Sequence, residues 1–305
     1  MPRFTRLAGT AILVGSVRAF QSQLKNYDST SSMDASSAGN VAVYWGQNSY
    51  GQANGNLAQQ PLATYCADSN IDIIPMAFLY QLTTGTGGQP VINFANQQNN
   101  CTLFDGTETL NCPDIGKDIT TCQEKYNKTI LLSVGGATYT EGGFTSSDLA
   151  ESNAEHIWAT FGPKSSSSKR KRDNSTILRP FGDASIDGFD IDLESTNQNF
   201  DVWTKKMRSL MDADSSKKYW LTAAPQCVYP DAADKSMLNG GIPFDAVWVQ
   251  FYNNGCGLQS FVAGAKNQTN FNFDVWDNWA STTSANKDVK VYIGVPAGQT
   301  GAGRF

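Results

Sequence analysis

The chain has 305 residues, of which 40% are hydrophobic and 11% aromatic, enough to form the core of one large domain or two ordinary ones. Its formal net charge of −5 argues against nucleic-acid binding, which requires a basic surface. The six cysteines include no Cys-x-x-Cys motif, and the chain has a single histidine, so disulfides are favoured over a zinc site.

The N-terminus has the pattern of a secretory signal peptide. Arg3 and Arg6 precede an apolar run at 7–17, and residues 17–19 resemble a cleavage site. The run is too short for a permanent membrane span. We therefore predict a signal peptide over 1–19, followed by a Ser-rich flexible leader over 20–39. Four N-x-S/T sequons are compatible with a secreted glycoprotein.

Seven short apolar runs, rich in β-branched and aromatic residues, predict buried strands. They lie at 41–46, 71–79, 129–136, 186–194, 219–225, 246–252 and 291–297. The segments between them are long enough for crossover helices, and 147–161 and 200–213 have helical patterns. Buried strands separated by helices predict an α/β fold with a parallel sheet, most simply a (β/α)8 TIM barrel.

Two segments depart from a regular barrel. The basic, Ser-rich stretch at 163–176 predicts an insertion loop, and its Lys-Arg-Lys-Arg run leaves open proteolytic processing or, less simply, a nucleic-acid patch. The chain stops at Phe305, soon after the seventh predicted strand. We therefore expect one barrel domain over 40–305 that ends before an eighth strand.

The strongest chemical signal is the segment DGFDIDLE at 187–194. Alternate residues of a strand face the same side, so Asp190, Asp192 and Glu194 should project together into the barrel. Closely spaced carboxyl groups push their pKa values apart, which can leave one of them protonated as an acid. Ca²⁺ or Mg²⁺ binding is the competing interpretation, although ligands along one strand do not wrap around an ion.

Other unusual residues fall at the C-terminal ends of the predicted strands, where barrels carry their chemistry. Besides Glu194, they are Trp45, Gln47, Gly135, Gly136, Gln226, Tyr252 and Asn253. Gln250 and Tyr252 share one face of their strand. For Trp45, stacking on a ligand and packing in the core both remain open. The paired glycines would allow close approach of the backbone beneath a site.

Together these motifs resemble family 18 chitinases of the class III, hevamine-like branch in plants and fungi. DGFDIDLE matches the family signature DxxDxDxE, and SVGG at 133–136 resembles its SxGG motif. The segments AVYWGQN (42–48), LTAAPQC (221–227) and VWVQFYNN (247–254) are similar to other strands of that branch. The resemblance runs from about residue 40 to residue 297.

The resemblance implies a substrate-assisted retaining endochitinase that needs no metal or cofactor. Glu194 would be the proton donor, Asp192 would orient the substrate acetamide, Asp190 would exchange a proton with Asp192, and Tyr252 would bind the acetamide oxygen. Gln250, Trp45, Gln226, Asn253 and Gly136 would bind sugar. Asp187, Gly135 and Ser133 would give structural support.

The same resemblance implies disulfides Cys66–Cys122, Cys101–Cys112 and Cys227–Cys256. It implies a secreted monomer acting on chitin or chitooligosaccharides, with no nucleic-acid or membrane partner; association with the cell wall stays open. Three other functions also remain open: a non-catalytic chitin-binding or inhibitor protein, an endo-β-N-acetylglucosaminidase acting on N-glycans, and an unrelated metal-dependent hydrolase.

Overall fold

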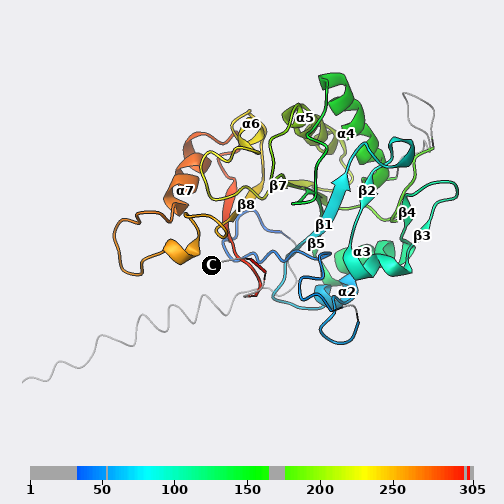
Figure 1. The fold of residues 1–305 in the computed structure, drawn as a ribbon, viewed down its shortest axis with the longest axis horizontal. Coiled ribbons are helices and arrows are strands. Elements are labelled where there is room, and N and C mark those ends of the chain that lie inside the picture. The colour runs from blue at the N-terminus through cyan, green and yellow to red at the C-terminus, as the bar shows by residue number, and fades with distance from the viewer. Residues whose placement is uncertain (1–32, 53, 165–175, 299–300, 303–305) are drawn as a thin grey trace, which may run out of the picture.

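The structure, a computed structural model, describes residues 33–52, 54–164, 176–298 and 301–302. Its main sheet contains six strands paired in parallel in the order of the chain: β1 (Ile73–Gln81), β5 (Thr129–Gly135), β6 (Gly188–Asp192), β7 (Trp220–Ala223), β8 (Ala246–Gln250) and β9 (Lys290–Gly294). The short strand β2 (Val91–Ile92) pairs antiparallel with the end of β1. Figure 1 shows the helices around the outside of these strands.

The segment predicted as the first strand lies parallel to β1 without forming a regular strand. Ala42 pairs with Ile73 and Trp45 with Met76 as isolated bridges. Within the described ranges, no pairing joins this segment to β9. The predicted barrel-type α/β fold is thus confirmed. Among the described residues its sheet does not close into a complete barrel.

Helices connect the strands and cover the outer face of the sheet. They are α2 (Leu62–Cys66), α3 (Pro113–Tyr126), α4 (Ser147–Phe161), α5 (Phe200–Ala213), α6 (Lys235–Leu238) and α7 (Phe273–Thr282). Short 3-10 turns lie at η2 (Thr86–Gly88), η3 (Ala95–Asn100) and η4 (Leu258–Ser260), and β3 (Thr102–Leu103) pairs with β4 (Leu110–Asn111). The two helices expected from the sequence pattern have the predicted bounds.

The alternation of β6 separates an apolar layer from a polar one. Phe189 and Ile191 are fully buried, and the ring of Phe189 lies 6.1 Å from that of Trp203 on α5. The alternate residues Asp190 and Asp192 therefore face the interior of the curved sheet. Burial of the outer layer fixes the register of β6, because a shift of one residue would exchange its two faces.

The end of the predicted leader belongs to the fold, which corrects the prediction that 20–39 is flexible throughout. Met33 is only 4% exposed and packs against Ile73, Leu131 and Trp248. Its backbone N–H donates to Thr129 Oγ1 at 2.9 Å. The predicted signal peptide, the rest of the leader and residues 165–175 of the insertion loop lie outside the described residues.

All three predicted disulfides are present: Cys66–Cys122, Cys101–Cys112 and Cys227–Cys256. The last one joins the loop after β7 to the loop after β8. Among the residues whose structure is described, none of the helices combines the length and apolar character required to cross a bilayer.

Candidate active site

The predicted row of acids forms at the C-terminal end of β6. Asp190 is fully buried, Asp192 is 6% exposed, and Glu194 lies two residues beyond the strand and is exposed. Spacing by two residues along the chain places the three carboxyl groups on a path from the interior to the surface. Only the outermost, Glu194, is directly accessible to a large substrate.

Asp190 is held by four hydrogen-bond donors. Tyr44 Oη and Ser133 Oγ donate to Oδ2 at 2.6 and 2.8 Å, and Thr222 Oγ1 and Trp248 Nε1 donate to Oδ1 at 2.7 and 2.8 Å. Burial raises the pKa of Asp190, and the hydroxyl donors counteract that effect. Because each donor stabilises the charged form, Asp190 is better able to remain ionised than Asp192, whose pKa is raised well above the ordinary value.

Asp192 has the opposite environment. Its carboxylate accepts one side-chain hydrogen bond, from Gln250 Nε2 at 3.0 Å. Burial raises its pKa well above the ordinary value, and the negative charges of Asp190, Glu194 and Asp231 act in the same direction. Of the two buried aspartates, Asp192 is therefore the one whose surroundings more strongly favour the protonated form.

Glu194 and Tyr252 border the open end of the row. Partial burial raises the pKa of Glu194, which favours the protonated form that a general acid needs. The pKa of Tyr252 is also raised, by burial and by the charges of Asp192, Glu194 and Asp190. The phenol is therefore a neutral hydrogen-bond donor that lies within electrostatic range of all three acids.

The predicted sugar-binding amides come together around the ends of β7 and β8. The backbone of Gln226 pairs with that of Gln250 as an isolated parallel β-bridge. Gln250 Nε2 also donates to Ala224 O at 2.9 Å. Asn254 Nδ2 donates to Gln226 Oε1 at 3.0 Å. Asn253 is exposed and has a left-handed backbone at φ 58°. Because the same Gln250 nitrogen also donates to Asp192, Gln250 supports the acid row.

The paired glycines let the backbone of β5 approach the acid row. Gly135 has a φ of +114°, and a Cβ at this position would lie 2.2 Å from the carbonyl oxygen of Asp192. Gly136 N–H donates to that same oxygen at 2.7 Å, and a Cβ on Gly136 would meet the ring of Phe78. A side chain at position 135 would therefore displace the Asp192 backbone, and a side chain at position 136 would clash with Phe78.

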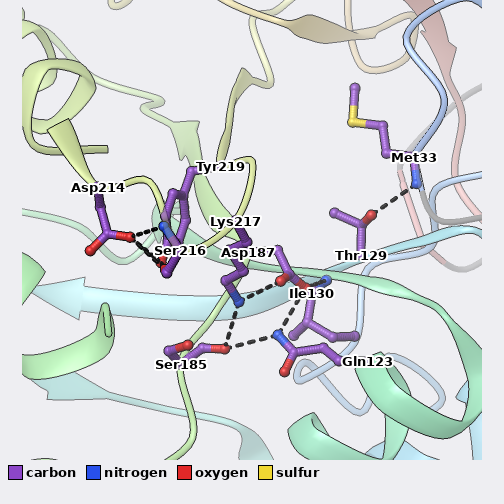
Figure 2. A network of polar contacts seen from close by, with 10 residues as sticks. All are labelled: Met33, Gln123, Thr129, Ile130, Ser185, Asp187, Asp214, Ser216, Lys217 and Tyr219. Atoms are coloured by element: carbon purple, nitrogen blue, oxygen red, sulfur yellow. Dashed lines mark hydrogen bonds and ion pairs between the residues drawn. The ribbon is translucent and has the colours of Figure 1, made fainter. Parts of the chain in front are cut away.

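Asp187 lies away from the row, as its place out of phase with the inward-facing residues predicts. It forms an ion pair with Lys217 at 2.6 Å and accepts hydrogen bonds from Gln123 Nε2 and Ile130 N–H (Figure 2). These contacts tie α3, β5 and the segment before β7 to the start of β6. The role of Asp187 is to anchor the strand that carries the acids.

Trp45 is a correction to the predicted set of sugar-binding residues. Its side chain is 4% exposed, its Nε1 donates to Gln60 O at 3.0 Å, and its ring lies 5.4 Å from that of Phe94. With its ring buried and its polar atom engaged, Trp45 packs in the core and offers no face on which a sugar can stack.

Three residues of the Asp190 environment were not predicted from the sequence: Tyr44, Thr222 and Trp248. Thr222 and Trp248 lie in the strand segments LTAAP and VWVQ, on the same alternation as the site residues farther along their strands. Strand alternation is therefore a signal by which Thr222 and Trp248 could be identified from the sequence. Which strands face one another across the interior, however, depends on the sheet order, which a single sequence does not give.

The surroundings of Asp190 do not suit a metal ion. Its carboxylate oxygens face O–H and N–H donors, whereas a cation requires further oxygen ligands. Within the described ranges, no group of three or more His, Cys, Asp or Glu side chains is arranged to hold a metal.

Comparison with known proteins assigns the chain to a family. The pattern of glycosyl hydrolases family 18 matches residues 40–302. A class III chitinase of Arthroderma benhamiae is 51% identical over 263 residues, which cover 86% of this chain and 71% of that protein. Endochitinase 33 of Trichoderma harzianum is 44% identical over 305 residues, covering 100% of this chain and 85% of that protein.

Solved structures agree with the fold. A chitinase from Ipomoea carnea has a TM-score of 0.64 and 29% identity, covering 88% of this chain and 85% of that one. A xylanase and alpha-amylase inhibitor protein from Scadoxus multiflorus also has a TM-score of 0.64, with 27% identity, covering 88% of this chain and 83% of that one. The match to the family pattern over most of the chain shows that this protein belongs to glycosyl hydrolases family 18.

Proposed function

We propose that the protein is a secreted endochitinase that cleaves β-1,4 linkages between N-acetylglucosamine residues with retention of configuration. The observation that supports this most directly is the acid row, in which two buried aspartates with raised pKa lead to an exposed carboxyl group whose pKa is also raised. The two chitinases at 51% and 44% identity support the choice of substrate. The predicted signal peptide and the three disulfides are compatible with an extracellular protein.

In the proposed reaction, Glu194 protonates the glycosidic oxygen as the bond to the leaving sugar breaks. The carbonyl oxygen of the substrate acetamide attacks the anomeric carbon and forms an oxazolinium ion. Asp192 orients the acetamide N–H and balances the positive charge of the oxazolinium ion. As that ion forms, Asp192 passes its own proton to Asp190. Tyr252 donates a hydrogen bond to the acetamide oxygen. Glu194 then takes a proton from the incoming water, whose oxygen opens the oxazolinium ion and restores the starting enzyme.

Two activities must be distinguished by experiment. The purified protein is incubated with a soluble chitooligosaccharide and, separately, with a glycoprotein carrying N-glycans, and the products and their anomeric form are followed from the first turnovers. The proposal predicts rapid release of β-anomers from the chitooligosaccharide. Preferential release of N-glycans would instead identify an endo-β-N-acetylglucosaminidase.

A non-catalytic inhibitor is the second candidate, because a solved structure described as a xylanase and alpha-amylase inhibitor shares this fold at 27% identity. The test is inhibition of a xylanase and an alpha-amylase by a stoichiometric amount of the protein, alongside the hydrolysis assay. The proposal predicts hydrolysis of the chitooligosaccharide without inhibition of either enzyme. Inhibition together with no turnover would overturn it.

A further inference from the structure

A second pair of aspartates lies on the loop between β7 and α6, outside the acid row. Asp231 is 5% exposed and its carboxylate accepts three backbone hydrogen bonds: from Gln226 at 2.8 Å, Ala233 at 2.7 Å and Asp234 at 3.1 Å. Three N–H donors thus converge on one carboxylate and hold the Asp231 side chain in a single orientation. These bonds also fix the start of the loop, where Gln226 bridges to Gln250 beside Asp192.

Asp234, three residues later, has no such donors. Its side chain is fully buried immediately before α6, and neither carboxyl oxygen has a hydrogen-bond partner among the described residues. An ionised carboxylate buried without a partner costs several kcal/mol, so such a group remains protonated instead. The two aspartates of this loop therefore have opposite hydrogen-bond environments.

Among the described residues, the charged groups that act on Asp234 are acidic. Asp231, Asp192 and Asp190 act on Asp234, and together with burial they raise its pKa well above the ordinary value. Asp231 also raises the pKa of Asp192, in addition to the effects of Asp190 and Glu194. Two phenols, Tyr44 and Tyr252, complete the ionisable groups around Asp192.

We propose that Asp231 and Asp234 are positioning residues that set the protonation of Asp192. Asp231 supplies a fixed negative charge that keeps the proton on Asp192. Asp234 stays neutral, which allows the loop to remain buried beside Asp192. The inference rests on the role of Asp192 in the proposed function. It adds a source of control outside β6, carried by a loop that the DxxDxDxE signature does not contain.

The effect on catalysis is tested with Asp231→Asn, which removes the charge and keeps the shape. Without that charge, the acid row loses its protons at lower pH. The alkaline limb of kcat/KM for a soluble chitooligosaccharide should therefore move down by roughly 0.5–1 pH unit. The matched control is Asp245→Asn at the opposite end of β8, where Asp245 pairs with Arg208; its pH profile should equal that of the wild type. An unshifted alkaline limb in Asp231→Asn would overturn the electrostatic role.

The neutrality of Asp234 is tested without any activity measurement. A carboxyl group whose pKa is raised by folding stabilises the protein fully below its unfolded pKa of about 4, and that contribution is lost as the pH rises. Asp234→Asn cannot ionise, so its Tm relative to the wild type should increase steadily from pH 4 to pH 9, whatever its absolute value. A Tm difference that is constant over this range would show that Asp234 is not a neutral acid in the folded protein.

The two readouts also separate this inference from the proposed function. If Glu194→Gln retained activity, the reaction assignment would fail, yet the Tm series of Asp234→Asn would still report on Asp234. If Asp231→Asn does not fold, Asp231→Ser takes its place in the pH series, because it also removes the charge of Asp231. Its alkaline limb should move to lower pH in the same way, and an unshifted limb would contradict the inference.

Discussion

At the scale of single residues, the site works by giving chemically similar carboxyl groups different surroundings. Asp190 receives four donors and Asp192 receives one from a side chain, although they are two residues apart on one strand. The donors favour charge on Asp190, while burial and neighbouring negative charges favour a proton on Asp192. Strand alternation brings the carboxyl groups together, and the residues across the interior give them different tendencies to hold a proton.

This difference predicts the behaviour of Asp192→Asn. The amide cannot share the proton of the pair or balance the charge of the oxazolinium ion, so kcat should fall by roughly 10²–10⁴-fold. The pH profile should also change, because the group that Asp190 and Glu194 are coupled to no longer titrates. A pH series of kcat and kcat/KM checks both effects, and a profile identical to that of the wild type would argue against proton sharing.

A second prediction concerns Asp187, which anchors β6 away from the site. Asp187→Ala removes the ion pair with Lys217 and leaves the donors of Gln123 and Ile130 without their acceptor. The free energy of unfolding should fall by about 1–3 kcal/mol, while kcat of the folded protein stays near the wild-type value. Denaturant unfolding and steady-state kinetics on the same sample measure the two quantities. A large loss of kcat with unchanged stability would place Asp187 in the reaction instead.

At the scale of elements, the close contact between β5 and β6 positions the acid row. Gly135 pairs with Asp192 in the parallel register, and its positive φ is a conformation that residues with a side chain rarely adopt. The contact is between backbones, so no rearrangement of side chains can make room for a Cβ at this position.

Gly135→Ala should therefore damage both the fold and the site. A methyl group 2.2 Å from the Asp192 carbonyl must push β5 and β6 apart, in addition to the strain of a positive φ. We expect a loss of at least about 2 kcal/mol in the free energy of unfolding and a strongly reduced kcat. Gly106→Ala is the matched control, because this glycine also has a positive φ but no atom within 4 Å of the added Cβ. Equal effects of the two substitutions would show that steric contact is not the cause.

The elements show what the sequence could predict. Six regular strands and two of the three long helices, α4 and α5, are predicted by periodicity, because buried faces leave a clear pattern of apolar residues; α3 was not predicted. The acid row followed from alternation alone. Alternation could not predict the surroundings of Asp190 or the burial of Trp45, because both depend on residues from segments far apart in the chain. The ordered residues after Met33 were also missed, since a Ser-rich segment with one apolar anchor has no periodicity.

At the scale of the whole molecule, desolvation by burial is the largest influence on the pKa of several carboxyl groups among the described residues. Burial raises the pKa of Asp118, Asp190, Asp192, Asp234 and Asp245. The carboxyl groups with lowered pKa, such as Asp34 and Asp214, lie at the surface and contribute little. Raised values stabilise the fold below the unfolded pKa of about 4, and that stabilisation is lost as the pH rises.

The Tm should therefore be highest at mildly acidic pH and should decline between about pH 5 and pH 9. A series of thermal unfolding curves at constant ionic strength measures this dependence. A Tm that rises toward alkaline pH would mean that the buried acids are ionised in the folded protein.

Reduction of the disulfides provides a further test at this scale. The bonds join residues 56, 11 and 29 positions apart, so opening them frees loops that the folded protein keeps closed. Each loss should cost about 2–4 kcal/mol of stability. A reducing agent is expected to lower the Tm markedly, as a comparison of unfolding curves with and without it would show. An unchanged Tm would contradict a structural role for the bonds.

The most direct test of the account is the turnover of a soluble chitooligosaccharide by Glu194→Gln, compared with Glu155→Gln on the exposed face of α4 as the matched control. The amide at 194 keeps the shape of the side chain but cannot donate the proton. The account predicts that kcat falls by about 10²–10⁴-fold or more, with the Tm and binding of the oligosaccharide preserved, while the control retains the wild-type rate. A Glu194→Gln variant that turns over at a rate close to that of the wild type would contradict the assignment of Glu194 as the catalytic acid.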